Sequence, residues 1–200
     1  MSEDYLTLID WRRRVADLYS GVRATLHTDA PAAHTLWRST RDELFRTHPQ
    51  SPLPGDERAT FRGLPYFAYD PRFATRARLR LLPEERYDVP SSGEGVIPFV
   101  RIGAVDLEWG SLDVFWLDAY SGGLFLPFRD ATAGKTTYGA GRYLLDTAKS
   151  ADLGAVGDEL ILDFNFAYHP SCRYDPKWVC PLAPPGNRLA VKIEAGERMS

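Results

Sequence analysis

Apolar residues recur every three or four positions over the first 50 residues, which is the spacing of amphipathic helices. The apolar stripe of the first helix consists of Leu8, Trp11, Val15, Leu18 and Val22. A second helix is predicted to begin near Asp29, because aspartate is a good N-cap residue and Pro31 is tolerated in the first turn. His48 and Pro49 are expected to end it, since the residue before a proline disfavours helical angles.

From residue 60 onward the hydrophobic period changes to two, which is typical of β-strands. Arg76, Arg78 and Arg80 alternate with apolar residues at 77, 79 and 81, so this strand is expected to bury one face and expose a basic one. Further strands are predicted over residues 66–69, 96–102, 104–109, 112–117, 124–129, 141–146, 160–168 and 187–195. Gly103 is interpreted as a tight turn, and residues 121–123 as a hairpin turn. Because residues 114–117 are apolar on both faces, their strand is expected to be central in its sheet.

Two helices followed by eight or nine short strands, without βαβ alternation, predict an α+β fold. We expect two N-terminal helices packed on a mainly antiparallel β-barrel or β-sandwich. A helical segment over residues 1–50 and a β-rich domain over residues 59–197 are predicted, joined by a linker rich in proline and glycine at 51–58. A chain of 200 residues suits one structural domain overall.

The charge of the chain limits its partners. With 24 Lys and Arg against 27 Asp and Glu, the net charge of −3 argues against a nucleic-acid binder. The absence of an 18-residue apolar run argues against a membrane-spanning helix. The first residues place acids before arginines, the reverse of a secretory signal, so a cytoplasmic location with reduced cysteines is expected.

The stretch over residues 162–197 organises the candidate chemistry. It contains both cysteines, the only two asparagines and five of the fifteen prolines, and it is predicted to form a strand, a rigid loop and a final strand. Reduced, buried thiols are the first interpretation of Cys172 and Cys180. The alternatives are a disulfide worth roughly 2.5 kcal/mol, a metal site with His169 and Asp163, and a Cys172 nucleophile beside His169. Because seven residues separate the cysteines, wider than usual zinc spacing, neither a metal nor a cofactor is predicted.

A second polar segment, FRDATAGKTTYGAGRY at 128–143, contains AGKTT, which is similar to the end of a phosphate-binding P-loop. Arg129 stands where that motif needs its first glycine, and a strand rather than a helix follows, so an NTPase is excluded. Leu144 likewise replaces the third glycine of a dinucleotide fingerprint. Arg129 and Arg142 at the two ends of this loop can hold an anion. The alternative is that Arg129 and Asp130 only brace a long hairpin.

The candidate site residues come from both segments. Asp163 and Asn165 share one face of the predicted strand, and a buried Asp163 needs a partner, for which Arg129 or Arg142 is the natural candidate. The candidates for acid–base or nucleophilic chemistry are Asp163, Asp130, Cys172 and His169. The predicted ligand-binding residues are Arg129, Arg142, Tyr138, Asn165, Tyr168 and Asn187.

A specific series of motifs runs through both segments: an Asp-Phe-Asn strand, Tyr-x-Pro-x-Cys, Cys-Pro-Leu, Pro-Pro-Gly-Asn-x-Leu and Ala-Gly-Glu. They read DFNFAYHPSCRYDP at 163–176 and VCPLAPPGNRLAVKIEAGE at 179–197, preceded by FRDATAGKTTYGAGRYL at 128–144. Over residues 35–197 the chain resembles the bacterial and archaeal family catalogued as domain of unknown function 1684, which has no assigned activity. The resemblance implies a shared framework of Asp163, Asn165, Tyr168, Cys172, Cys180, Asn187 and the Arg129–Asp130 pair. His169 stands where relatives more often carry Asn, which weighs against a metal or Cys–His role.

Two hypotheses for function follow. The first is a pocket for a small anionic ligand between residues 128–142 and residues 168–187, with catalysis left open. The second is a non-catalytic protein–protein interaction module that uses the Pro-rich loop at 181–185 or the Arg-lined strand at 76–80. A concave polar pocket would favour the first hypothesis, and convex loops with a flat apolar patch the second.

Overall fold

A computed structural model of the chain describes the backbone of residues 2–118 and 120–200, and the side chains of all of these except residues 2 and 3. The helices are α1 (Ser2–Leu26), α2 (Ala30–Thr47) and α3 (Gly55–Arg58), with short 3-10 turns η1 (Pro71–Phe73), η2 (Thr147–Lys149), η3 (Phe164–Phe166) and η4 (Ser171–Arg173). The strands are β1 (Ala74–Arg78), β2 (Arg80–Pro90), β3 (Val96–Leu107), β4 (Gly110–Leu117), β5 (Leu124–Phe128), β6 (Arg142–Asp146), β7 (Ala155–Val156) and β8 (Glu159–Asp163).

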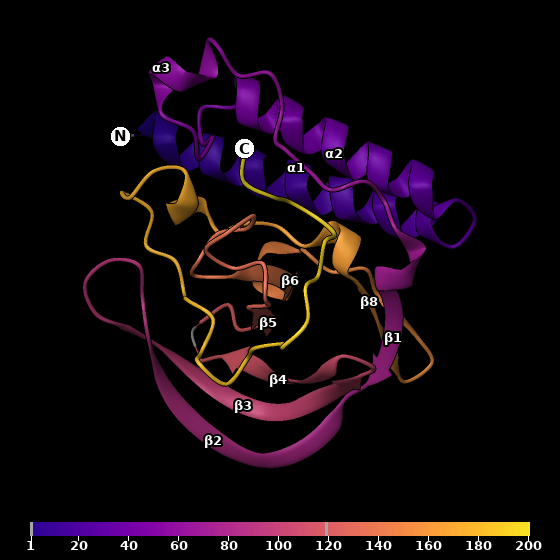
Figure 1. Ribbon diagram of the computed structural model, residues 1–200. Helices are drawn as coiled ribbons and strands as arrows, with labels where there is room; N and C mark the ends of the chain where they lie inside the picture. The colour runs from indigo at the N-terminus through magenta and orange to yellow at the C-terminus, as the bar shows by residue number, and fades with distance from the viewer. Residues whose placement is uncertain (1, 119) are drawn as a thin grey trace.

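The two N-terminal helices lie side by side across one side of the β-rich part (Figure 1). Asp29 caps α2 as expected, because its carboxylate accepts the Ala32 backbone N–H at 2.9 Å. The apolar stripe of α1 and the inner face of α2 pack on residues that precede and follow β8. This cluster contains Leu18, Tyr19, Val22, Ala33, Trp37, Ala151, Leu153 and Phe166. The helices and the β-rich part therefore share a hydrophobic core.

The strands form two antiparallel sheets, one in the order β1-β8-β7 and one in the order β2-β3-β4-β5-β6. The α+β class with N-terminal helices is confirmed. Within residues 2–118 and 120–200 the sheets do not close into a barrel, so the barrel alternative is not supported. β4 lies between β3 and β5, which is the central position that its apolar character predicts. Long curved ribbons of β2 and β3 run along the side opposite the helices (Figure 1).

Two expected strand boundaries are wrong. Residues 96–107 form one continuous strand, β3, rather than two strands joined at Gly103. Gly103 lies at a register shift in β3, and a Cβ there would be 2.6 Å from the carbonyl oxygen of Arg80. The position therefore needs glycine for close approach of two backbones, not for a turn. The strand predicted at 76–81 is split between β1 and β2, and Leu81 is 75% exposed.

The second half of the chain is less regular than its pattern indicates. β8 ends at Asp163, whose carboxylate accepts the Asn165 N–H at 2.9 Å and begins the turn η3. Residues 66–69 form no strand and make a single bridge, from Tyr66 to Glu197. The predicted last strand at 187–195 is also wrong. This segment forms no strand, and its backbone makes scattered hydrogen bonds to other segments instead of a regular ladder. Its backbone bonds include Leu189 N–H to the Arg129 carbonyl at 2.9 Å.

No helix in the described part of the chain is both long enough and apolar enough to cross a membrane.

The contact at Gly103 leads to a stability prediction. Gly103→Ala places a methyl group against the Arg80 backbone, which cannot move without disturbing β2, so the free energy of unfolding should fall by about 2 kcal/mol. Urea denaturation measures the change. Gly186→Ala is the matched control, since an added Cβ there meets no described atom within 4 Å. Equal stability of the two variants would contradict the close approach.

Candidate functional site

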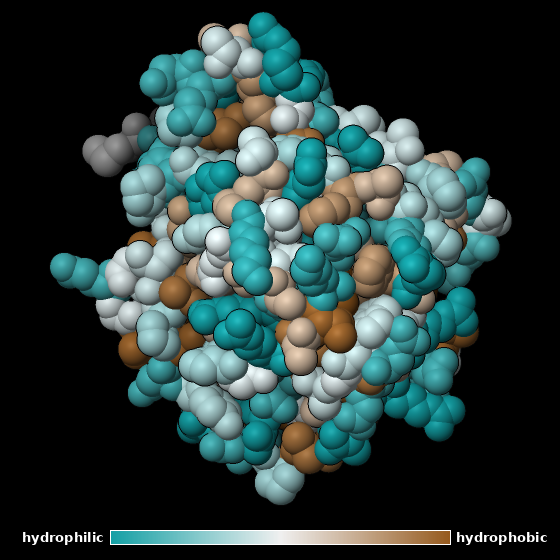
Figure 2. Space-filling model, in the orientation of Figure 1, coloured by the Kyte–Doolittle hydropathy of each residue, from teal (hydrophilic) through white to brown (hydrophobic). Residues whose placement is uncertain are grey.

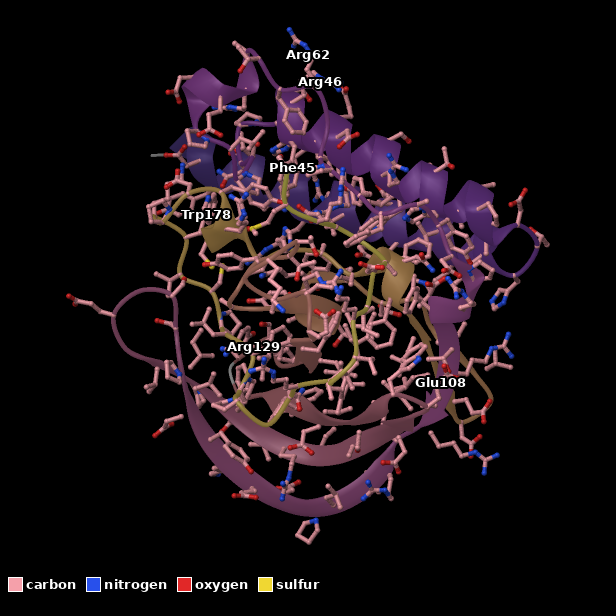
Figure 3. All side chains as sticks on the ribbon, in the orientation of Figure 1. Phe45, Arg46, Arg62, Glu108, Arg129 and Trp178 are labelled. Atoms are coloured by element: carbon pink, nitrogen blue, oxygen red, sulfur yellow. The ribbon has the colours of Figure 1, made fainter. Side chains whose placement is uncertain are left out.

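The loop over residues 168–187 packs against the segment over residues 128–143, so the two predicted segments meet. Tyr143 and Tyr168 exchange backbone hydrogen bonds of 2.8 and 3.1 Å, and the Arg129 N–H donates to the Asn187 carbonyl at 2.9 Å. Arg129 lies beside the C-terminal segment, whereas Trp178 lies on the loop next to the helices (Figure 3). The predicted site residues thus lie around one junction, but they have different roles in it.

Arg142 and Asp130 form a buried ion pair of 3.4 Å, and each side chain is 1% exposed. Arg142 also donates to the carbonyls of Ile193 at 2.9 Å, Ala195 and Glu197. Burial lowers the pKa of Arg142, and the charge of Asp130 opposes this shift. Asp130 further accepts the Ile193 N–H at 2.7 Å. Hydrogen bonds from this ion pair therefore fix the C-terminal segment, where a strand would be fixed by a regular backbone ladder.

The side-chain amides of both asparagines form hydrogen bonds with the backbone of other segments. The Asn187 amide accepts the Asp113 N–H at 2.8 Å and donates to the carbonyls of Asp113 and Pro127 at 2.9 and 2.7 Å. The Asn165 amide exchanges similar bonds of 3.0 and 2.8 Å with the Asp70 backbone. A carboxamide has a donor and an acceptor, like a peptide group, so it can substitute for a neighbouring strand. The two asparagines serve the fold in this way.

Among the residues that the structure describes, Asp163 forms no ion pair with an arginine, contrary to expectation. Its carboxylate accepts the Asn165 N–H at 2.9 Å and the Asn165 side-chain N–H at 2.8 Å, and the Tyr69 hydroxyl lies 3.4 Å away. Burial raises the pKa of Asp163 to about 6, although these hydrogen bonds oppose the shift. The carboxyl group is therefore shielded from water and titrates closer to neutrality than an ordinary aspartate.

His169 belongs to a buried chain of polar groups that the sequence did not reveal. Its Nδ1 lies 3.4 Å from a Glu197 oxygen, and its Nε2 accepts the Tyr138 backbone N–H at 3.2 Å. Glu197 also pairs with Arg41 at 2.8 Å, whose guanidinium lies over the Tyr168 ring. Burial alone would raise the pKa of Glu197, but His169 and Arg41 bring it below its ordinary value. Both ring nitrogens of His169 thus have partners within the fold.

Arg41 and Glu197 were missed for different reasons. Arg41 lies on a charged helix and reads as a surface residue, yet its side chain is only 11% exposed. Glu197 ends the Ala-Gly-Glu motif, which is the only signal in the sequence that marks it.

The two cysteines are free thiols that hydrogen-bond to each other. Cys172 lies on η4 and is partly exposed, whereas Cys180 is 4% exposed. The hydrogen bond from Cys180 lowers the pKa of Cys172 to about 6 against the effect of burial, and the neighbouring Ser92 and Tyr138 side chains contribute in the same direction. The same hydrogen bond, together with burial, raises the pKa of Cys180. Cys172 is therefore the more acidic and more accessible thiol of the pair.

Ser92 reaches the cysteines from the turn between β2 and β3, a position that no sequence motif marks. Its N–H donates to the Cys180 carbonyl at 2.9 Å, and its Oγ accepts the Cys180 N–H at 2.8 Å. Its hydroxyl lies 2.9 Å from the Trp178 carbonyl. The β2–β3 turn thus fixes the backbone around Cys180.

Two further geometric results bear on ligand binding. Among the described residues, no group of three or more His, Cys, Asp or Glu side chains could hold a metal ion. Two hollows of ≈ 350 and ≈ 420 Å³ lie along α1 and α2, and neither is lined by a predicted site residue. A ligand pocket between residues 128–142 and 168–187 stays a prediction.

The buried carboxyl of Asp163 predicts a pH effect. Since its pKa rises from 3.8 to about 6 on folding, the folded state binds more protons in this range, and its stability falls as the pH rises through it. At about 1.4 kcal/mol for each pKa unit, Asp163→Asn should gain about 3 kcal/mol relative to the wild type between about pH 4 and pH 7.5. Urea denaturation at several pH values measures the difference.

The difference in unfolding free energy between the wild type and Asp163→Asn isolates the contribution of the Asp163 carboxyl group. Burial lowers the pKa of His34 to about 4, which reduces stability on acidification, but His34 is present in both proteins. A stability difference that stays constant with pH would contradict the assignment.

Comparison with known proteins identifies the same family that the sequence motifs indicate. The chain is similar to an uncharacterized protein of Haloarcula marismortui solved by solution NMR, with 37% sequence identity and a TM-score of 0.56. The alignment covers 81% of this chain and 90% of that chain. No curated protein matches the sequence. A family model described as "Protein of unknown function (DUF1684)" matches residues 59–198, more than half of the chain, and the chain therefore belongs to this family.

Proposed function

We propose that the protein binds a small molecule where residues 168–187 meet residues 128–143, and that it reacts with this molecule through the thiol of Cys172. One observation carries the proposal: hydrogen-bond donors from separate segments converge on this sulfur. They are the thiol of Cys180 and the phenol of Tyr138, while the hydroxyl of Ser92, which donates its proton to the Trp178 carbonyl, lies beside them. Such donors stabilise a thiolate, which is the nucleophilic form of cysteine.

The exposure of Cys172 supports the same role. A cysteine that only fills a core is buried and unreactive, whereas Cys172 is partly open to solvent on a short turn. With a pKa of about 6, most of it is thiolate at neutral pH. The thiolate would attack an electrophilic carbon or sulfur atom of the ligand. The Tyr138 phenol is then the candidate donor of a proton to the departing group.

A second candidate function is anion binding at Arg129. Its Nη2 donates to the Ala183 carbonyl at 3.0 Å, while its Nε is buried and has no partner among the described residues. A buried donor without an acceptor is unfavourable, so an anion that accepted this hydrogen bond would stabilise the fold. The Nε of Arg142 also lacks a partner among the described residues, but Asp130 and three carbonyls already bond its two terminal nitrogens, so Arg142 contributes less to this candidate.

The interaction-module hypothesis stays a prediction with weaker support. Arg78 pairs with Asp158 at 3.3 Å and Arg80 pairs with Asp106 at 2.8 Å, which balances much of the positive charge on the Arg-lined strands. Hydrophobic and hydrophilic side chains are interspersed over the face in Figure 2. An interaction module of this kind would need a continuous apolar patch.

The reactivity of Cys172 can be measured by alkylation with iodoacetamide as a function of pH. The rate should follow a titration with a midpoint near pH 6. Because a more acidic thiol is also a weaker nucleophile, the advantage over an ordinary cysteine is only about twofold at pH 7 but about tenfold at pH 6. The rates should therefore be compared at the lower pH, with peptide mapping to identify the alkylated residue.

Variants at the site and a matched control variant show whether the alkylation rate and its midpoint depend on the groups around Cys172. Cys172→Ser should remove the fast reaction, and Tyr138→Phe should raise the midpoint because one donor to the thiolate is lost. Tyr120→Phe removes the hydroxyl of a fully exposed tyrosine and should leave the midpoint unchanged. A midpoint near about pH 8.5, as for a free cysteine, would overturn the proposal.

Anion binding at Arg129 is tested by thermal unfolding with inorganic phosphate and with di- and tricarboxylates. An anion at about 100 times its dissociation constant should stabilise the wild type by about 2.7 kcal/mol and raise the Tm by roughly 5–10 °C. Arg129→Gln should lose this shift, and Arg188→Gln, at an exposed neighbour of Asn187, should keep it. An equal shift in both variants would exclude Arg129 as the binding residue.

A further inference from the structure

Cys180 interacts directly with the Cys172 thiol, and a nucleophilic role for Cys172 alone leaves Cys180 without a function. The two thiols are therefore neighbours in the folded protein, and oxidation would join their sulfur atoms in a disulfide bond of about 2.05 Å. Cys180 is buried and holds its proton more tightly than Cys172 does. This asymmetry is the arrangement of an attacking thiol and a resolving thiol.

The surrounding backbone holds the two cysteines differently. Cys180 is fixed between two hydrogen bonds to Ser92, and the next residue, Pro181, bridges to Ser91. Cys172 lies on the three-residue turn η4, which has no side-chain cap. Rotation of the Cys172 side chain toward a fixed Cys180 can therefore close the bond without moving the β2–β3 turn.

We propose that Cys172 and Cys180 form a dithiol–disulfide couple that exchanges with small anionic disulfides. The inference rests on the reactive Cys172 proposed above and adds a partner thiol, a class of substrate and a two-electron reaction. The hydrogen bond between the thiols, their unequal burial and the fixed backbone at Cys180 carry it.

The exchange proceeds in two steps. The Cys172 thiolate attacks one sulfur of a disulfide RSSR, the S–S bond breaks, and RS⁻ leaves with a proton from solvent or Tyr138. Cys180 then loses its proton and its sulfur attacks Cys172 Sγ in the mixed disulfide, which releases the second RS⁻. The protein dithiol is oxidised by two electrons and the substrate disulfide is reduced to two thiols. The proton that Cys172 released to solvent on ionisation and the proton that Cys180 loses balance the two protons taken up by the released thiolates, and Tyr138 regains any proton it gives from solvent.

Charged groups around the pair favour an anionic substrate. The Arg173 guanidinium acts on the neighbouring Tyr138 hydroxyl, and the Lys149 ammonium acts on Cys180, in both cases lowering the pKa of the group. The other titratable groups that interact with the cysteines are the phenols of Tyr138 and Tyr143, which are neutral at pH 7 because their pKa values are raised, mainly by burial. The Lys149 ammonium is paired with the Asp146 carboxylate at 3.4 Å, so the positive charge that an approaching disulfide meets comes mainly from Arg173, for which no ion pair is found among the described residues.

The stoichiometry of thiol release tests the couple. An aromatic disulfide that carries two carboxylates and releases a coloured thiolate is added to the reduced full-length protein. The wild type should release two thiolates and lose two hydrogens in mass, with a Cys172–Cys180 crosslink in its peptide map. Cys180→Ser should release one and keep the probe on Cys172, and Cys172→Ser should show no fast release.

Each other outcome has a definite meaning. If the wild type releases one thiolate and retains the probe, the couple is wrong while the reactive Cys172 stands. If the wild type shows no fast release, both proposals fail. Circular dichroism establishes that the serine variants are folded, and Cys180→Ala repeats the test with a different side chain. A Cys180→Ala variant that still releases two thiolates would also overturn the couple.

The charge preference is tested with a neutral dipyridyl disulfide. Arg173→Gln should slow the first release from the anionic probe by about threefold or more and leave the neutral probe unchanged. Arg76→Gln removes an exposed arginine on β1 and should change neither rate. Equal slowing with both probes would mean that Arg173 only supports the local fold, and the anionic substrate class would be rejected.

Discussion

The buried guanidinium of Arg142 is the interaction on which the second half of the molecule depends. A charge in an apolar interior is costly unless it is paired, and here one carboxylate and three carbonyls bond the two terminal nitrogens of the guanidinium, while its Nε has no partner among the described residues. Those carbonyls belong to residues 193–197, which form no strand of their own. The side chain on β6 thus orders a segment that backbone pairing alone leaves irregular. Glu197 then reaches Arg41 and His169, which links this segment to α2 and to the loop that carries the cysteines.

The predictability of the fold follows the range of the interactions that determine it. The helices and the central strand β4 depend on local periodicity and on the cap at Asp29, and these were recognised. Gly103 was misread because its need for glycine comes from the backbone of Arg80 on another strand, which no local pattern records. The change from β8 to η3 was missed because a single side-chain cap at Asp163 overrides the alternation of the strand.

The candidate site shows the same division. The concentration of asparagine, cysteine and proline in residues 162–197 correctly marked a special segment, but composition does not separate structural from reactive groups. Asn165 and Asn187 are fully used as bridges between backbones. Ser92, which contacts both the Cys180 backbone and the Cys172 thiol, comes from a turn about 80 residues away, a separation too long for any spacing rule.

The position of the Arg142 partners along the chain constrains the order of folding during synthesis. β6 leaves the ribosome 51 residues before Ile193, so the guanidinium has the Asp130 carboxylate as a partner but none of its three carbonyl acceptors in that interval. The five-stranded sheet can assemble provisionally, but its interior cannot seal around a guanidinium whose carbonyl acceptors are still missing. Closure is thus a late event, and the nascent protein passes through an open state in which the future cysteine loop is still unanchored.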